Sequence, residues 1–171
     1  DTRGQIWAGT RLSNVTLSCA HLAVVPEVCA NGAAFALDSV WSDAGELWGE
    51  KDGVRYHGDD FVEAQWSIVP GGGSFAKHLR LLKIRDHDEV SGVHHYIFEV
   101  FDDRELTWSL GCYGEASGAA YVLGDISVDT QTGNISSRPG RVYIACAAGA
   151  VGKAVSWGYT PWELGVENFT A

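Results

Sequence analysis

Short runs of β-branched and aromatic residues alternate with polar, turn-forming residues along most of the chain. A turn signal recurs about every ten residues, and this spacing favours an all-β domain over alternating strands and helices. The pattern therefore predicts a mainly β fold, an antiparallel β-sandwich or barrel-like domain, with one short helix near the C-terminus.

The clearest element is a tight hairpin around Asp52 and Gly53. Residues 47–50 and 54–56 flank this pair and have the composition of strands. Asp-Gly supplies the positive φ angles that a tight hairpin turn requires. Further strands are expected at residues 61–69, 79–84, 94–101, 106–110, 119–123, 126–129 and 141–145.

Residues 147–157 are the stretch that favours a helix. The stretch is rich in alanine, and Ala147, Val151 and Val155 recur at a spacing of four, which puts them on one helix face. We expect about two to three turns that end at Gly158, because glycine readily adopts the left-handed conformation found at helix ends.

The size and composition are those of one folded domain. The chain has 171 residues, of which 46% are hydrophobic and 20% charged, enough to bury a real core. Within it we expect an N-terminal strand or arm at residues 1–12, open to exchange between subunits, and a single β-rich domain at residues 13–171.

The charge balance narrows the range of partners. Twelve Lys and Arg residues stand against 22 Asp and Glu residues, a formal net charge of −10. Such a charge repels the phosphates of nucleic acids and anionic membrane surfaces. No apolar run approaches the roughly 18 residues of a membrane span. We therefore expect no nucleic-acid partner and no membrane insertion.

Several features point to export. The sequence contains no Met and starts at Asp1, which we interpret as processing after export. The four cysteines lack the C-x-x-C spacing of zinc or thioredoxin-like sites, which favours two disulfides in an oxidising compartment. Four buried free thiols in a cytosolic protein are the alternative. We expect Cys19 to pair with Cys29, because this disulfide closes a short local loop. We also expect the protein to be secreted or on the cell surface.

Three Asn-x-Ser/Thr triplets begin at Asn14, Asn134 and Asn168. Each borders a turn or a terminus, where an attached glycan reaches solvent. We therefore expect all three Asn side chains on the surface, and at least one of them glycosylated in the exported protein.

Clusters of His and Asp invite a metal interpretation that their spacing does not favour. His94 and His95 are neighbours on an expected strand, so their side chains point to opposite faces and do not grip one ion. His57, Asp59 and Asp60 lie in a Gly-containing bend, where Asp side chains commonly cap turns. We expect no metal site and no cofactor.

Motifs for catalysis are equally sparse. Glu63 and Glu99 lie on expected strands, where two carboxylates that face each other across a cleft would serve glycoside hydrolysis. Nothing in the sequence selects them over the other acids. The G-x-S-x-G elbow of serine hydrolases is absent. We assign no catalytic residue and expect a non-enzymatic protein.

Residues 145–162, ACAAGAVGKAVSWGYTPW, resemble the A-C-x-x-G-A-x-x-K-C-x-x-x-G-Y-x-P-W element of ADYC-domain proteins, which occur among exported bacterial proteins. Residues 53–64, 79–84 and 108–112 are similar to that family's strand series and its cysteine-bearing strand. Ala154 stands where the family has a second Cys, and the Ala-Asp-Tyr-Cys element is not in the sequence. The resemblance, over the C-terminal part of the chain, implies an exported β-rich fold and carries over no catalytic residue.

The resemblance also bears on two local features. It places Cys112 and Cys146 in the same half of the fold, which implies that they form the second disulfide. It further implies a clamp at the Gly-Tyr-x-Pro-Trp element, in which Tyr159 and Trp162 fold back as large apolar plugs. An aromatic platform for a sugar is the alternative for these two rings.

Aromatic residues are abundant and point to a surface role. Seven Trp and six Tyr residues exceed what a core of this size needs, so we expect exposed rings for sugar stacking or protein interfaces. Residues 5–10 have strand character, and Gln5, Ile6 and Trp7 are expected to add to the sheet of a neighbouring copy. Repeated head to tail, this contact would give a homopolymer.

These observations favour a non-enzymatic secreted or cell-surface structural protein, a glycosylated subunit of an extracellular fibre or surface assembly. The first alternative is a carbohydrate-binding module with exposed aromatic residues, whose partners are glycans. The second alternative is a glycan-active enzyme.

Overall fold

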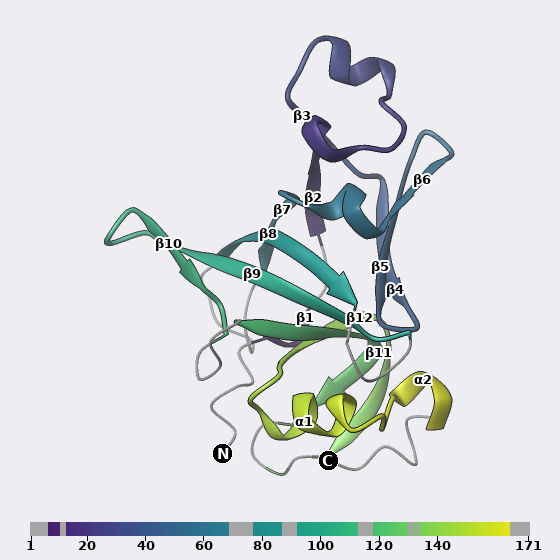
Figure 1. Ribbon diagram of the computed structural model, residues 1–171, viewed down its shortest axis with the longest axis vertical. Helices are drawn as coiled ribbons and strands as arrows, with labels where there is room; N and C mark the ends of the chain where they lie inside the picture. The colour runs from purple at the N-terminus through teal and green to yellow at the C-terminus, as the bar shows by residue number, and fades with distance from the viewer. Residues whose placement is uncertain are drawn as a thin grey trace.

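The computed structural model describes residues 7–10, 13–68, 77–86, 92–112, 118–129, 132 and 134–164. They form a mainly β protein of antiparallel sheets with a short helix near the C-terminus, which confirms the predicted fold class (Figure 1). Neither sheet in these ranges closes into a barrel, so the arrangement is sandwich-like.

The strands are β1 (Trp7–Thr10), β2 (Ser13–Ser18), β3 (Ala34–Ala36), β4 (Ser39–Asp43), β5 (Glu46–Lys51), β6 (Val54–His57), β7 (Gln65–Ile68), β8 (Lys77–Asp86), β9 (His94–Asp102), β10 (Thr107–Leu110), β11 (Ala119–Val128) and β12 (Ile135–Cys146). The helices are the 3-10 turns η2 (Cys19–His21), η3 (Glu27–Ala30) and η4 (Gly58–Phe61), and α1 (Ala150–Ser156) and α2 (Pro161–Leu164). None of the helices in the described ranges is long and apolar enough to cross a membrane.

Antiparallel pairing arranges the strands into a large and a small sheet. The large sheet has the order β1-β12-β11-β9-β8-β7-β2-β3, and β10 pairs with β9. The small sheet has the order β4-β5-β6. Its β5–β6 turn contains Asp52 (φ 52°) and Gly53 (φ 78°), which confirms the predicted hairpin.

Among the elements that differ from the expectation are strand β11 and helix α1. The two strands expected between residues 119 and 129 are the single strand β11, because its pairing with β12 resumes after an irregularity at Asp125 (φ 59°), and the extra residues lie in β12 between Ser137 and Val142. Helix α1 is shorter than expected, because the chain first makes a turn in which the Gly149 N–H donates to the Cys146 carbonyl (2.9 Å).

The core lies on both faces of the large sheet at its β11–β12 side. Along β11, Ala120 and Val122 pack into a cluster that includes the inward residues of the small sheet. Tyr121 and Leu123, on the other face, pack into a second cluster that includes α1. Strands β11 and β12 are therefore covered on one side by the small sheet and on the other by the helices (Figure 1).

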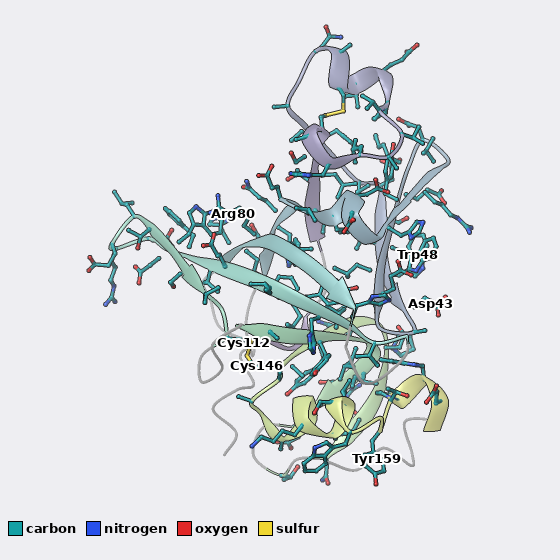
Figure 2. All side chains as sticks on the ribbon, viewed as in Figure 1. Asp43, Trp48, Arg80, Cys112, Cys146 and Tyr159 are labelled. Carbon is teal, nitrogen blue, oxygen red and sulfur yellow. A yellow bond between two sulfur atoms is a disulfide. The ribbon has the colours of Figure 1, made fainter. Side chains whose placement is uncertain are left out.

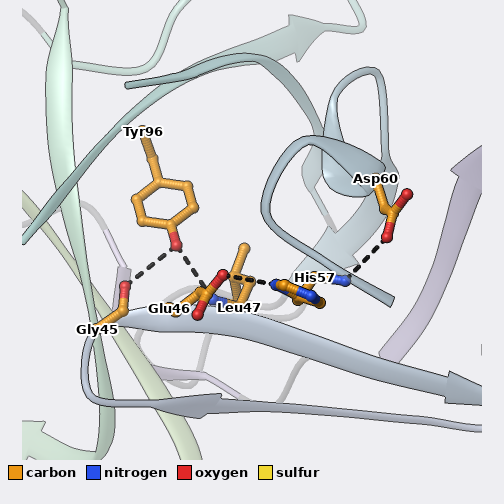
Figure 3. A network of polar contacts seen from close by, with 6 residues as sticks. All are labelled: Gly45, Glu46, Leu47, His57, Asp60 and Tyr96. Atoms are coloured by element: carbon orange, nitrogen blue, oxygen red, sulfur yellow. Dashed lines mark hydrogen bonds and ion pairs between the residues drawn. The ribbon is translucent and has the colours of Figure 1, made fainter. Parts of the chain in front are cut away.

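A buried tyrosine ties the small sheet to the large one. The Tyr96 hydroxyl of β9 donates to the Gly45 carbonyl (3.1 Å) and accepts from the Leu47 N–H (3.0 Å), at the turn between β4 and β5 (Figure 3). Burial raises the pKa of Tyr96, so the hydroxyl stays protonated and remains a donor. The β4–β5 hairpin is thereby fixed against β9.

Of the two rings expected in the aromatic clamp near the C-terminus, only Trp162 packs inward. A Cβ at Gly45 would lie 2.6 Å from Cη2 of Trp162, which packs partly buried against the second cluster, so Trp162 is the plug that was predicted. The prediction for Tyr159 is wrong, since its side chain is 56% exposed (Figure 2). Helix α1 ends at Ser156, and the chain then turns at Gly158 (φ 87°), where the Tyr159 N–H donates to the Ala154 carbonyl (3.0 Å); this turn leaves the ring outside.

Both disulfides have the expected pairing. Cys19–Cys29 closes the loop that carries η2 and η3 and projects at the top of Figure 1. Cys112–Cys146 joins the chain after β10 to the last residue of β12, inside the core. Asp60 also holds the projecting loop, because its carboxylate accepts a hydrogen bond from the Ala23 N–H (2.8 Å). Two disulfides fit an oxidising environment.

Candidate functional site

Within the described part of the chain, no second layer covers the face of the large sheet opposite the small sheet over β2, β7, β8 and β9. Strand alternation places Trp66 and Leu79 in the core and sends their neighbours to this open face. The side chains on it are polar or aromatic and are half-buried or exposed. They are Thr16, Ser18, Gln65, Ser67, His78, Arg80, Glu99 and Phe101, together with Trp108 of β10.

The strand register lines up four of these side chains in one row. Thr16 is opposite Gln65, and Gln65 is opposite Arg80. Arg80 is in turn opposite Glu99, to which its guanidinium donates through Nε (3.1 Å) and Nη2 (Figure 2 labels Arg80). The charge of Arg80 is thus compensated within the row. The side-chain amide of Gln65 bonds to none of the residues described, which leaves its donor and acceptor to a ligand.

Two rings border this row. Trp108 is opposite Phe101, and their ring centroids lie 5.3 Å apart at an interplanar angle of 55°. The guanidinium carbon of Arg80 lies 4.6 Å from the centroid of the Trp108 ring, a cation–π contact. On β7 and β8, Ser67 Oγ and His78 Nδ1 are 3.0 Å apart. Aromatic and hydrogen-bonding groups therefore lie side by side.

Two hollows lie on this face and share two residues. One measures about 290 Å³ and the other about 280 Å³. Thr16 and Gln65 line both hollows, so we treat them as one feature, the sheet groove. Its aromatic hollow is also lined by Trp66, Ser67, His78, Leu79, Phe101 and Trp108, and its polar hollow by Ser18, Ala33, Ala34, Glu63 and Arg80.

Glu63, in the polar hollow, has a backbone conformation that is rare for its residue type. Its φ is 64°, in the left-handed region, which costs a non-glycine residue about 1–2 kcal/mol. Its N–H donates to the Leu81 carbonyl (2.7 Å). Its carboxylate accepts from Ser18 Oγ (3.2 Å) and lies 3.6 Å from His21 Nε2. The fold thus holds a half-exposed carboxylate at the groove.

The chemistry of the sheet groove suits an uncharged polar ligand. Small-molecule sites are typically concave, with apolar or aromatic walls and a few convergent polar groups. Within the described part of the chain, no three His, Cys, Asp or Glu side chains gather as a potential metal site. A ligand with an apolar face and several hydroxyl groups matches the aromatic wall and the hydrogen-bonding row.

A row of rings on the outer face of the small sheet is less suited to a ligand. Trp41 is opposite Trp48, and Trp48 is opposite His57, with centroids 6.5 Å and 4.3 Å apart at interplanar angles of 15° and 14°. Because these rings stack on one another, their faces contact neighbouring rings. Glu46 Oε1 lies 3.0 Å from His57 Nδ1 and orients that ring (Figure 3). This row stabilises the small sheet.

The expected glycosylation sites have different positions. Asn134 is exposed just before β12. Asn14 lies in β2, but its side chain is outside the described part of the structure, and so is the whole of Asn168. Glycosylation at these three residues stays a prediction.

Of the expected subunit interface, Gln5 and Ile6 lie outside the described residues. Trp7 begins β1, which pairs with β12 of the same chain and places Trp7 opposite Ile144. The exchange of this strand between copies stays a prediction.

Of the His and Asp clusters, the bend at His57 and Asp60 has the capping role that was expected. Asp60 accepts a hydrogen bond from the His57 N–H (3.2 Å) and caps η4 (Figure 3). His95 Nε2 lies 2.9 Å from the Tyr121 hydroxyl. Of the two carboxylates considered for hydrolysis, Glu63 lines the polar hollow, whereas Glu99 is engaged by Arg80, as described above.

Fold and groove together define a disulfide-linked, antiparallel β domain with a ligand-sized groove on one sheet face. The family model of the ADYC domain matches residues 58–170, and the chain belongs to the ADYC-domain family. The match confirms the resemblance found in the sequence, and it includes β7–β10 of the groove but not β2. No curated protein and no solved structure matches the chain significantly.

The sequence analysis did not single out Gln65, Arg80 or Trp108 as site residues. Alternation with buried Trp66 and Leu79 marks the first two as outward-facing, and this signal is readable in the sequence. Their proximity to Trp108 depends on the pairing of β7, β8, β9 and β10, which no local pattern reveals.

Proposed function

We propose that the protein is a secreted or cell-surface module that binds glycans. The observation that carries this proposal is the sheet groove, in which Trp108 and Phe101 border a strip of hydrogen-bonding side chains. The sequence raised this function as the alternative to an assembly subunit, and the geometry of the groove favours it.

A sugar ring combines an apolar face of C–H groups with a rim of hydroxyl groups. The aromatic wall offers a surface against which the apolar face packs. Gln65 and the Ser67–His78 pair offer donors and acceptors to the hydroxyl rim. An arrangement of this kind gives affinity through stacking and selectivity through hydrogen bonds.

The remaining features agree with an extracellular role. The net charge of −10 disfavours nucleic acids and other polyanions as ligands. The two disulfides fit an oxidising compartment. The Asn-x-Ser/Thr triplets at Asn14, Asn134 and Asn168 support glycosylation of the exported chain.

The test is glycan-array screening followed by calorimetry, with the wild type and two matched Trp variants. Trp108→Ala removes the aromatic wall and is expected to weaken binding by about 30-fold, the effect of truncating a hot-spot residue. Trp157→Ala is the control, because Trp157 is 73% exposed and lies outside the groove. It should bind like the wild type.

Two results would count against glycan binding. One is the absence of any glycan ligand at millimolar concentration, and the other is equal affinity for wild type and Trp108→Ala, with both shown to be folded by circular dichroism. Chromatography of the bound glycan after long incubation tests the enzymatic alternative, since shorter products would contradict a purely binding role.

A second candidate function, an assembly subunit, is supported by the position of β1. This strand of four residues is the terminal strand of the large sheet and pairs with β12 through Trp7–Ile144 and Thr10–Val142. Withdrawal of β1 would expose the β12 edge to the same strand of another copy, so the pairing seen within one chain serves equally between chains.

Sedimentation and electron microscopy at high protein concentration test this second function. Full-length protein is expected to form oligomers or fibres, and deletion of residues 1–10 is expected to leave a folded monomer. A full-length monomer at millimolar concentration, or unfolding on deletion, would assign β1 to its own sheet alone.

A further inference from the structure

We infer that the sheet groove takes a linear, non-acidic oligosaccharide of at least two sugar units, with one unit in the aromatic hollow and the next in the polar hollow, and that Glu63 excludes acidic sugars. This inference rests on the proposed glycan binding and names the ligand class of that same site.

The length of the ligand follows from the size of the groove. The two hollows, at about 290 Å³ and 280 Å³, are each close to the lower limit of small-molecule sites, roughly 300 Å³, which suits one sugar unit in each. Thr16 and Gln65 line both hollows and therefore lie at their junction. A ligand that occupies both hollows crosses this junction, where the free amide of Gln65 would meet the link between two sugar units.

The charge of the ligand follows from the polar hollow. Arg80 lines it, but its guanidinium is already paired with the Glu99 carboxylate. The carboxylate of Glu63 accepts from the neutral Ser18 hydroxyl, and its side chain is 52% exposed. The uncompensated charge that a ligand meets is therefore negative. Glu63 accepts hydrogen bonds from hydroxyl groups but repels the carboxylate of a uronic acid.

The backbone of Glu63 supports a role beyond folding. Its φ of 64° is one that glycine adopts without strain, so the residue present there is not the one that local stability favours. Strained positions of this kind tend to persist where the side chain has a function. We therefore expect the side chain of Glu63, and not its backbone, to have the function at this position.

The experiment is isothermal titration calorimetry at pH 8. The probes are cello-, malto- and chito-oligosaccharides of one to four units, with oligogalacturonides as acidic counterparts. The neutral series that binds is expected to gain about tenfold in affinity from one to two units, and acidic counterparts are expected to bind at least fivefold more weakly.

Two variants test Glu63, and a third is the charge control. Glu63→Gln keeps the size and removes the charge, so acidic probes should gain at least fivefold while neutral probes change little. Glu63→Gly relieves the backbone strain, so it should be more stable than the wild type and equally permissive toward acidic probes. Glu105→Gln removes one exposed carboxylate from the β9–β10 turn, outside both hollows, and should leave the selectivity unchanged.

The outcomes separate this inference from the function on which it rests. Equal affinity for one and several sugar units would overturn the two-hollow ligand, even if Trp108→Ala abolishes binding. Unchanged selectivity in both Glu63 variants would overturn the role of Glu63 and leave glycan binding intact. The absence of binding to every probe and to the glycan array would overturn both.

Discussion

Helix α1 carries a glycine, Gly152, where it lies against the end of β12. A Cβ added there would clash with the Cys146 carbonyl oxygen and lie 2.8 Å from the Ala147 Cα. Both obstacles are backbone atoms, and the Ala147 N–H is bonded to the Ala119 carbonyl (2.9 Å). Neither backbone atom can move aside as the end of a flexible side chain would. In Gly152→Ala the gain in helix propensity therefore competes with a loss in packing.

Packing outweighs propensity at this position. In an exposed helix the change from glycine to alanine gains about 1 kcal/mol. Overpacking of a core costs about 1–3 kcal/mol, and a fixed backbone places Gly152→Ala at or above the upper end. The free energy of unfolding is therefore expected to fall by about 2 kcal/mol, which lowers Tm by about 4–8 °C in a chain of this size.

Thermal unfolding followed by circular dichroism measures the effect. The matched control is Lys153→Ala, which changes the next residue of α1 on its exposed side and is expected to alter stability by less than about 0.5 kcal/mol. A Tm for Gly152→Ala equal to or above that of the wild type would refute the packing of α1 on β12.

Two further predictions concern covalent and polar links in the core. The cysteines of Cys112–Cys146 are separated by 34 positions in the sequence and those of Cys19–Cys29 by 10. Replacing the first pair by Ala should therefore cost about 4 kcal/mol in urea unfolding, and replacing the second about 2.5 kcal/mol. A larger loss for the second pair would contradict the dependence on loop length. Tyr96→Phe should cost about 1–3 kcal/mol, because it leaves a buried N–H unpaired. Burial raises the Tyr96 pKa above its usual value of 10.0. The stabilisation by the protonated Tyr96 hydroxyl is therefore complete below pH 10 and is lost as the pH rises further. Between pH 9 and 12 the wild type should lose more stability than Tyr96→Phe.

Local signals predicted the elements whose structure depends on neighbouring residues. The Asp52-Gly53 hairpin is such a case, because the turn conformation belongs to the two residues themselves. The strand expected from residue 61 begins only at Gln65, since the turn capped by Asp60 includes Phe61. This cap depends on the side chain of Asp60, three residues after His57, and the pattern of apolar residues contains no information about it.

Elements held by distant partners were not predicted. Strand β2 alternates polar and apolar residues only from Asn14 to Ser18, β3 contains only three residues, and β4 has no period of two. Their extended form comes from pairing, as between Leu17 and Phe35 or between Thr16 and Gln65. Pairing across 18 or 49 positions is a property of the folded chain, and the same holds for the groove.

The two ends of the large sheet differ in how their faces are covered. At residues 119–123 of β11 and 142–146 of β12 both faces are buried, so these positions are committed to the core, whereas residues 136–140 of β12 are exposed. Over β7, β8 and β9 one face packs into the core, and the side chains of the other face contact mainly one another, as in the Arg80–Glu99 pair. Substitutions at groove positions outside the Arg80–Glu99 and Phe101–Trp108 contacts can therefore alter the surface of the groove while the core stays intact.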